Sequence, residues 1–230
     1  MIVDKMTKAE LLKELREDYD YFNGRNNGWI TKYSKKLRDK RIPNHKVLAI
    51  TPYTTPNGNK VKVFIFKEKV GKVNILSRTF LFEVGLRCLI PNFDSVGKPL
   101  NVVIFTKHFQ DRLLERTGKT LIESLIMLRE SGAGGVCIKP YESYKEQGLE
   151  EGEWYVANMN NTLCLATTHK WGFILTTVIT KRQESKSQKI EYLICKSESN
   201  EHDKELREED EKQVLLDKQR YGRNYYYPRS

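Results

Sequence analysis

The first hydrophobic positions of the chain recur at the spacing of an amphipathic helix. They follow Thr7-Lys8-Ala9-Glu10, in which a threonine and a glutamate three residues later form a capping box, a common helix start. The apolar positions that come next, at intervals of about one helical turn, are Leu11, Leu12, Leu15, Tyr19 and Phe22. This pattern predicts a helix over residues 7–22 that packs through its apolar stripe.

A second helix is predicted over residues 29–41. The segment before it, residues 23–28, reads Asn-Gly-Arg-Asn-Asn-Gly and is a strong helix breaker. Trp29, Ile30, Tyr33 and Leu37 supply the apolar positions, and lysines and arginines lie between them. This helix therefore carries much of the local positive charge.

Beyond Pro43 the pattern becomes typical of strands. Residues 47–53, 60–66 and 73–84 are rich in β-branched and aromatic side chains. Between the first two lies Pro56-Asn57-Gly58-Asn59, and Asn-Gly tolerates the positive φ values of a tight hairpin turn. These segments predict an antiparallel meander.

The second half of the chain combines two helices with a further meander. An apolar run over residues 100–105 leads into a short helix over 105–116, and a capping box at Thr120-Leu121-Ile122-Glu123 starts another that ends near Gly132. Residues 154–158, 162–168 and 173–180 are rich in strand formers. We therefore predict the α+β class, with antiparallel β-meanders, an N-terminal helix and a central helix pair.

Three regions follow from these elements. Residues 1–90 hold the first helices and meander, and residues 100–195 form an α+β unit. Between them, Pro91 to Pro99 is rich in proline, glycine and asparagine and is predicted to be a loop, either within one elaborated domain or at the junction of two. Residues 196–230 form a charged tail, acidic from Glu198 to Glu211, that is partly helical or disordered.

The composition narrows the class of partner. The 230-residue chain has a formal net charge of +10 and a pI near 9.3, which favours polyanions. Nucleic acid is the first partner to expect, with RNA preferred over DNA, and an acidic protein is the alternative. No apolar run approaches the length of a membrane span, so no membrane partner is expected, and the sequence leaves the oligomeric state open.

The cysteines indicate no metal site and a reducing compartment. Cys88, Cys137, Cys164 and Cys195 are widely spaced, with no pair at metal-ligand spacing. Each lies in or near an apolar run, which suits buried, reduced thiols better than a disulfide framework. We expect a cytoplasmic protein that needs no metal and no cofactor.

Candidate chemistry concentrates on the helix that contains His108, Arg112 and Arg116. Residues four apart share a helix face, so a histidine would stand beside two arginines that can hold phosphate, with Lys107 adjacent. The alternative is an amphipathic helix whose polar face is solvated.

Late polar residues could complete such a site. His169 and Lys170 lie in a predicted hairpin turn, and Thr177 lies in the last predicted strand. If the sheet curls around the helices, His108 and His169 could act as base and acid in metal-independent phosphoryl transfer to a ribose hydroxyl, with the arginines stabilising charge. The alternative for His169 is a surface histidine in a turn.

The order of a strand, the His108 helix, a second helix and a meander that ends in residues 173–180 resembles the RelE/ParE-like toxin fold and the wider barnase and EndoU-like ribonuclease assemblage. The resemblance covers about residues 100–180 of the chain. It implies metal-independent RNA cleavage, with His108, Arg112 and Arg116 lining the cleft, Thr177 beside the scissile phosphate, and His169 as a second acid-base candidate.

Three hypotheses remain from the sequence. The first is a metal-independent, toxin-like ribonuclease. The second is a non-catalytic nucleic-acid-binding or accessory protein of a phage or mobile element, and the third is a protein whose basic face binds an acidic partner. The C-terminal Arg223, Tyr225 and Tyr226 add a possible binding arm, because aromatic and basic side chains can stack on bases and pair with phosphates.

Overall fold

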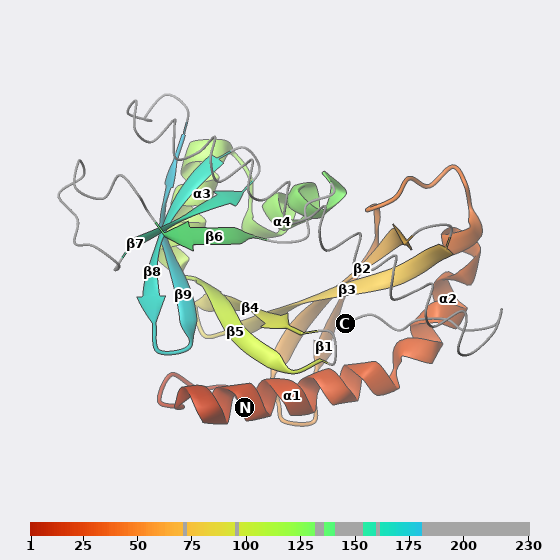
Figure 1. Cartoon of the computed structure of the whole chain (residues 1–230), viewed down its shortest axis with the longest axis horizontal. Coiled ribbons are helices and arrows are strands. Elements are labelled where there is room, and N and C mark those ends of the chain that lie inside the picture. Colours follow the sequence, from red (N-terminus) through yellow and green to blue (C-terminus); the bar gives the residue numbers. More distant parts are fainter. Residues whose placement is uncertain (71–72, 95–96, 132–135, 141–153, 160–161, 181–230) are drawn as a thin grey trace.

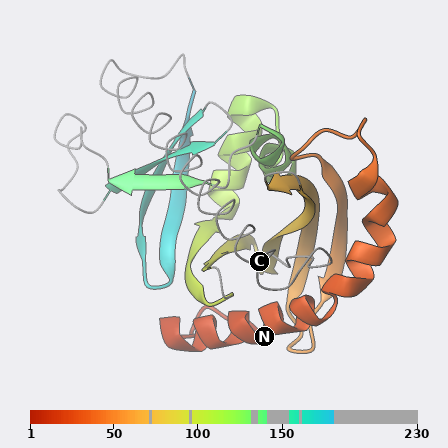
Figure 2. The ribbon, with the colours of Figure 1, turned by 45° about the vertical axis from the view of Figure 1, so that its right-hand side comes forward.

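The computed structural model describes residues 1–70, 73–94, 97–131, 136–140, 154–159 and 162–180. Two pairs of helices lie on opposite sides of one mixed sheet (Figures 1 and 2). Helices α1 and α2 pack on one face, and α3 and α4 pack on the other. The α+β class predicted from the sequence is confirmed.

The first two helices begin and end close to the predicted positions. Helix α1 spans Lys8–Gly24, and Thr7 and Glu10 form the capping box expected there. Helix α2 spans Asn26–Arg38, so the Asn-Gly segment interrupts the helices only around Arg25, and α2 begins three residues earlier than predicted. Most of the predicted apolar positions of both helices are buried as the periodicity requires, whereas Leu12 and Ile30 are half-buried.

Nine strands form the sheet, in the order β1-β2-β3-β4-β5-β9-β8-β7-β6. Their bounds are Val47–Thr54 (β1), Lys60–Val70 (β2), Val73–Val84 (β3), Arg87–Phe93 (β4), Pro99–Phe105 (β5), Cys137–Pro140 (β6), Trp154–Met159 (β7), Thr162–His169 (β8) and Gly172–Ile179 (β9). All neighbours are antiparallel except β5 and β9, which pair in parallel. That pairing joins the two meanders into one sheet.

Two strands depart from the prediction. Pro91 to Phe93 belong to β4, not to a loop, and Pro91 lies opposite Val102 of β5. Proline is tolerated there because β3 pairs with β4 only as far as Leu89, so no ladder partner is lost on that side. Strand β6 was not predicted, because its four residues end in Pro140 and lack a clear alternating pattern.

The alternation along the strands divides the buried side chains between two cores. In β5, Val102 and Ile104 face α1 and α2, whereas Val103 and Phe105 face the other pair of helices. Helix α3 spans Lys107–Thr117 and buries Phe109 and Leu113 in this second core, beside α4 at Leu121–Glu130. The sheet therefore separates any site on α3 from any site on α2.

Candidate functional site

The predicted His108 stripe lies at the start of α3. Thr106 caps the helix by accepting a hydrogen bond from the Phe109 N–H at 3.1 Å, which fixes the entry of the chain into the helix. His108 is exposed in the first turn, and Arg112 lies one turn further on with its side chain 40% exposed. His108 and Arg112, two of the three residues of the predicted stripe, thus lie on the solvent side of the helix.

Neighbouring carboxylates neutralise two cations of this stripe. The Arg112 guanidinium lies 2.7 Å from the Glu115 carboxylate, three residues along the helix. Lys107 forms an ion pair with Asp111, one turn away. With three cations and two acids, α3 has a net charge of only +1.

Arg116 faces the sheet. Its guanidinium donates a hydrogen bond to the backbone oxygen of Val178 in β9, and Nη1 lies 3.5 Å from the Thr177 hydroxyl. The structure therefore brings together two of the predicted residues, Arg116 and Thr177. Their contact fastens the end of α3 to the last described strand.

His169 lies in a different environment, at the turn between β8 and β9. Its Nδ1 accepts a hydrogen bond from the Trp171 N–H at 3.3 Å, and the two rings meet edge to face. Burial lowers the pKa of His169, and the nearby positive charges of Arg87 and Lys170 lower it further. Lys170 donates to the backbone oxygen of Asp4, so this turn holds the N-terminal segment in place.

The two histidines lie on opposite sides of the sheet. Trp171, in contact with His169, packs in the core of α1 and α2, whereas α3 packs in the other core. They also lie at different positions along the strands. His169 pairs with Gly172 of β9, whereas Phe105, the last residue of β5 before α3, pairs with Leu175, three residues further along β9. That offset is about 10 Å along the strand. The base and acid pair predicted from the sequence is therefore not assembled in this structure.

Helix α2 carries a more strongly positive surface than α3. Helix α2 contains four cations and no acid, whereas the charges of α1, α3 and α4 are mixed. Between residues 25 and 46 there are eight cations and one acid, which gives this segment a net charge of +7 in a chain of net charge +10. All eight of these cationic side chains are exposed.

The buried face of α2 determines which way these cations point. Trp29, Tyr33 and Leu37 pack against the sheet, and the Trp29 Nε1–H donates to the Tyr53 hydroxyl at 2.9 Å. The intervening positions face solvent. On α2 and at its two ends, six cations have no ion-pair partner among the described residues, and we call them the α2 basic surface: Arg25, Lys32, Lys35, Lys36, Arg38 and Lys40.

The single acid of the segment is committed to one partner. Asp39 binds Arg41 through two side-chain contacts, at 3.0 and 2.8 Å, and also accepts the Arg41 backbone N–H at 2.9 Å. These hydrogen bonds lower the pKa of Asp39 to about 2. The carboxylate therefore offsets Arg41 and leaves the α2 basic surface without an acidic partner from its own segment.

Lys67 anchors the connection from α2 to β1. This lysine is only 2% exposed, and its ammonium donates to the backbone oxygens of Asp39 at 2.6 Å and Ile42 at 2.9 Å. The backbone of Lys67 also pairs with His45 and Lys46. A buried cation thus orders the backbone that carries part of the exposed charge.

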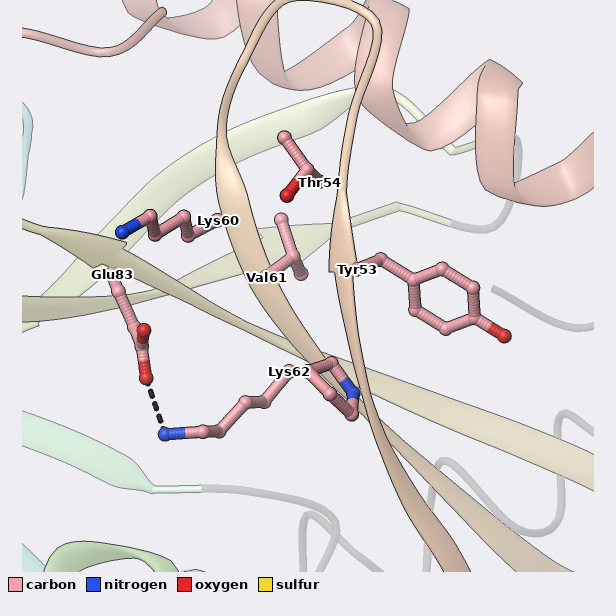
Figure 3. Close-up of a pocket in the computed structure, with 7 residues that line it drawn as sticks. Tyr53, Thr54, Lys60, Val61, Lys62 and Glu83 are labelled. Atoms are coloured by element: carbon pink, nitrogen blue, oxygen red, sulfur yellow. Dashed lines mark hydrogen bonds and ion pairs between the residues drawn. The ribbon is translucent and has the colours of Figure 1, made fainter.

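A small pocket on the nearby hairpin offers a weaker candidate site (Figure 3). It measures about 220 Å³, below the roughly 300 Å³ at which small-molecule sites begin. Figure 3 shows Lys62 reaching toward Glu83, and the two form an ion pair across the pocket. Tyr53 points away from it, so the pocket presents no converging set of unpaired groups.

The sequence had identified a cationic second helix but did not place a site there. The signal for a site on α2 was the ratio of eight cations to one acid between residues 25 and 46. The spacing of one histidine and two arginines on α3 is a weaker indication of a phosphate-binding site. The other proposed binding residues, Arg223, Tyr225 and Tyr226, lie outside the described residues, as does the charged tail from residue 196.

Comparison with known proteins identifies no relative. No family model, curated protein or solved structure matches the chain. The resemblance of residues 100–180 to the RelE/ParE-like toxins therefore stays a prediction. Within the part of the chain that the structure describes, no helix is long and apolar enough to cross a membrane, and no three potential metal ligands cluster.

Proposed function

We propose that this protein binds nucleic acid through the α2 basic surface, as a binding protein and not as a nuclease. The observation that carries the proposal is the set of six exposed cations on one helix and its ends, none of which has a carboxylate partner in the described part of the chain. Helix α2 is about 20 Å long, enough to follow several consecutive phosphates.

The arrangement has an energetic cost that ligand binding would remove. Lys32 and Lys36 are four residues apart, and Lys35 is three residues from both Lys32 and Arg38. Like charges at these spacings destabilise a helix by about 0.2–0.5 kcal/mol per pair. A polyanion bound to α2 relieves this repulsion.

The nuclease hypothesis has weaker support. It needs an acid-base pair beside unpaired arginines, but His169 lies across the sheet from α3, while Arg112 and Arg116 already have protein partners. Single-stranded RNA is the first ligand to test, followed by DNA. The free thiols of Cys88 and Cys164 support a reducing, cytoplasmic setting, while a phage or mobile-element origin stays a prediction.

The test compares two variants of equal net charge. In one, Lys32, Lys35 and Lys36 become alanine, and in the control the exposed Lys5, Lys8 and Lys13 become alanine. We expect the α2 variant to bind an RNA oligonucleotide at least about tenfold more weakly than the control at about 50 mM salt. Equal affinities would overturn the proposal. Saturable binding of an acidic protein without affinity for RNA or DNA would replace it with the third hypothesis.

A further inference from the structure

The charge distribution of the chain contains an internal counterpart to the α2 basic surface. Residues 198–211 hold eight acids and two bases, a net charge of −6 against the +7 of residues 25–46. The eight acids are Glu198, Glu201, Asp203, Glu205, Glu208, Glu209, Asp210 and Glu211. Opposite charges of this size attract strongly at low ionic strength and are screened over about 10 Å at 0.1 M salt.

The residues that connect the described part of the chain to the acidic segment are numerous enough to let this segment reach α2 of the same chain. Thr180 is the last described residue, and 17 residues separate it from Glu198. An extended chain of that length spans up to about 60 Å. A compact body of about 180 residues has a radius of gyration of only about 16 Å, so the acidic residues can reach any face of it.

Among the described helices, α2 is the one such a segment fits. It carries four cations and no acid, whereas α1 and α4 hold more acids than bases. In α3, Lys107 and Arg112 are ion-paired and Arg116 faces the sheet. We propose that residues 198–211 dock on the α2 basic surface of the same chain and compete there with nucleic acid. The competition rests on the proposed function; the contact itself does not.

Carbodiimide coupling tests the contact directly, because it joins carboxylates to lysines that touch. We expect coupling of residues 198–211 to Lys32, Lys35 or Lys36 in the full chain, identified by mass spectrometry. In a mixture of isotopically light and heavy chains, each coupled pair should be entirely light or entirely heavy. Mixed pairs would replace the proposal with docking between two copies, and equal coupling to Lys5, Lys8 and Lys13 would overturn it.

Competition is measured with a chain in which five acids of the segment are neutralised: Glu205→Gln, Glu208→Gln, Glu209→Gln, Asp210→Asn and Glu211→Gln. The control neutralises five other acids and has the same net charge: Glu142→Gln, Glu146→Gln, Glu150→Gln, Glu151→Gln and Glu153→Gln. We expect the first variant to bind RNA about tenfold more tightly than the control at about 50 mM salt, and the gap to close toward 0.5 M. No gap at low salt would overturn the competition. If neither variant binds RNA yet the coupling is specific, the proposed function fails and the contact stands.

Discussion

Asp39 holds Arg41 in a two-pronged ion pair, with Nε 3.0 Å from Oδ1 and Nη2 2.8 Å from Oδ2. This contact explains how a segment with one acid keeps a strongly positive surface. A carboxylate placed among several lysines could neutralise any of them, but here its hydrogen-bonding capacity is used by a single arginine. The α2 basic surface is therefore left without a counterion from its own segment.

The Asp39 pair gives a prediction for acid titration. Because Arg41 donates to the ionised carboxylate, the side-chain carbon of Asp39 should titrate with a pKa of about 2, below the ordinary 3.8. A group with a lowered folded-state pKa contributes stability that is present above the ordinary value and is lost as the pH falls through about 2. NMR titration measures the midpoint, and in Arg41→Ala it should move up toward 3.8. A midpoint that does not respond to Arg41→Ala would contradict the pairing.

Lys67 is predicted to act as a positioning residue for the basic segment. Lys67→Met keeps an apolar stem in the core but removes the hydrogen bonds to the Asp39 and Ile42 carbonyls. Hydrogen exchange of residues 39–46 should accelerate by at least about tenfold, which corresponds to the net loss of one or two hydrogen bonds. Exchange in α1 should be unchanged and serves as the internal reference. Uniform acceleration along the chain would indicate global destabilisation instead.

Arg116 is predicted to stabilise the fold and not to bind ligand. Arg116→Ala removes the charged donor to the Val178 carbonyl and should lower the free energy of unfolding in urea by about 1–2 kcal/mol. Arg112→Ala is the matched control on the same helix, and its exposed pair with Glu115 should contribute less than about 0.5 kcal/mol. RNA affinity should be the same in both variants. Loss of RNA binding or cleavage with unchanged stability in Arg116→Ala would restore α3 as the functional site.

The parallel pairing of β5 with β9 depends on Gly172. A Cβ atom at this position would lie 2.2 Å from the backbone oxygen of Val102, and backbone atoms in a ladder cannot move aside locally. Gly172→Ala should therefore cost about 3 kcal/mol in the free energy of unfolding. Gly28→Ala, with open space around it in α2, should instead stabilise the protein by about 0.5 kcal/mol. Equal effects of the two substitutions would contradict the close approach of β5 and β9.

Local signals predicted most of the elements, and long-range contacts account for what was missed. The capping boxes at Thr7 and Thr120 and the turn at Gly58 occur as expected, because each depends on residues close in sequence. Strand β4 was mistaken for a loop at Pro91, since its tolerance of proline depends on where β3 stops pairing. Local pattern alone did not show that a strand near residue 100 pairs in parallel with one near residue 175.

In the candidate site too, local patterns predicted some features, and long-range contacts determine the others. The helical spacing of His108, Arg112 and Arg116 was real, but the separation of His108 from His169 follows from the sheet, which no local pattern contains. The charge bias of residues 25–46 was visible in the sequence and needed only the buried face of α2 to show that the cations are exposed.

The salt dependence of RNA binding tests the central claim most directly. Each phosphate neutralised by the protein contributes about 0.7 to the slope of log affinity against log salt for a single strand. Substitution of Lys32, Lys35 and Lys36 by alanine should therefore reduce the slope of the full chain by about 2, while alanine at Lys5, Lys8 and Lys13 should leave it unchanged. If both triple variants keep the slope of the original chain, the α2 basic surface does not contact phosphate and the account is wrong.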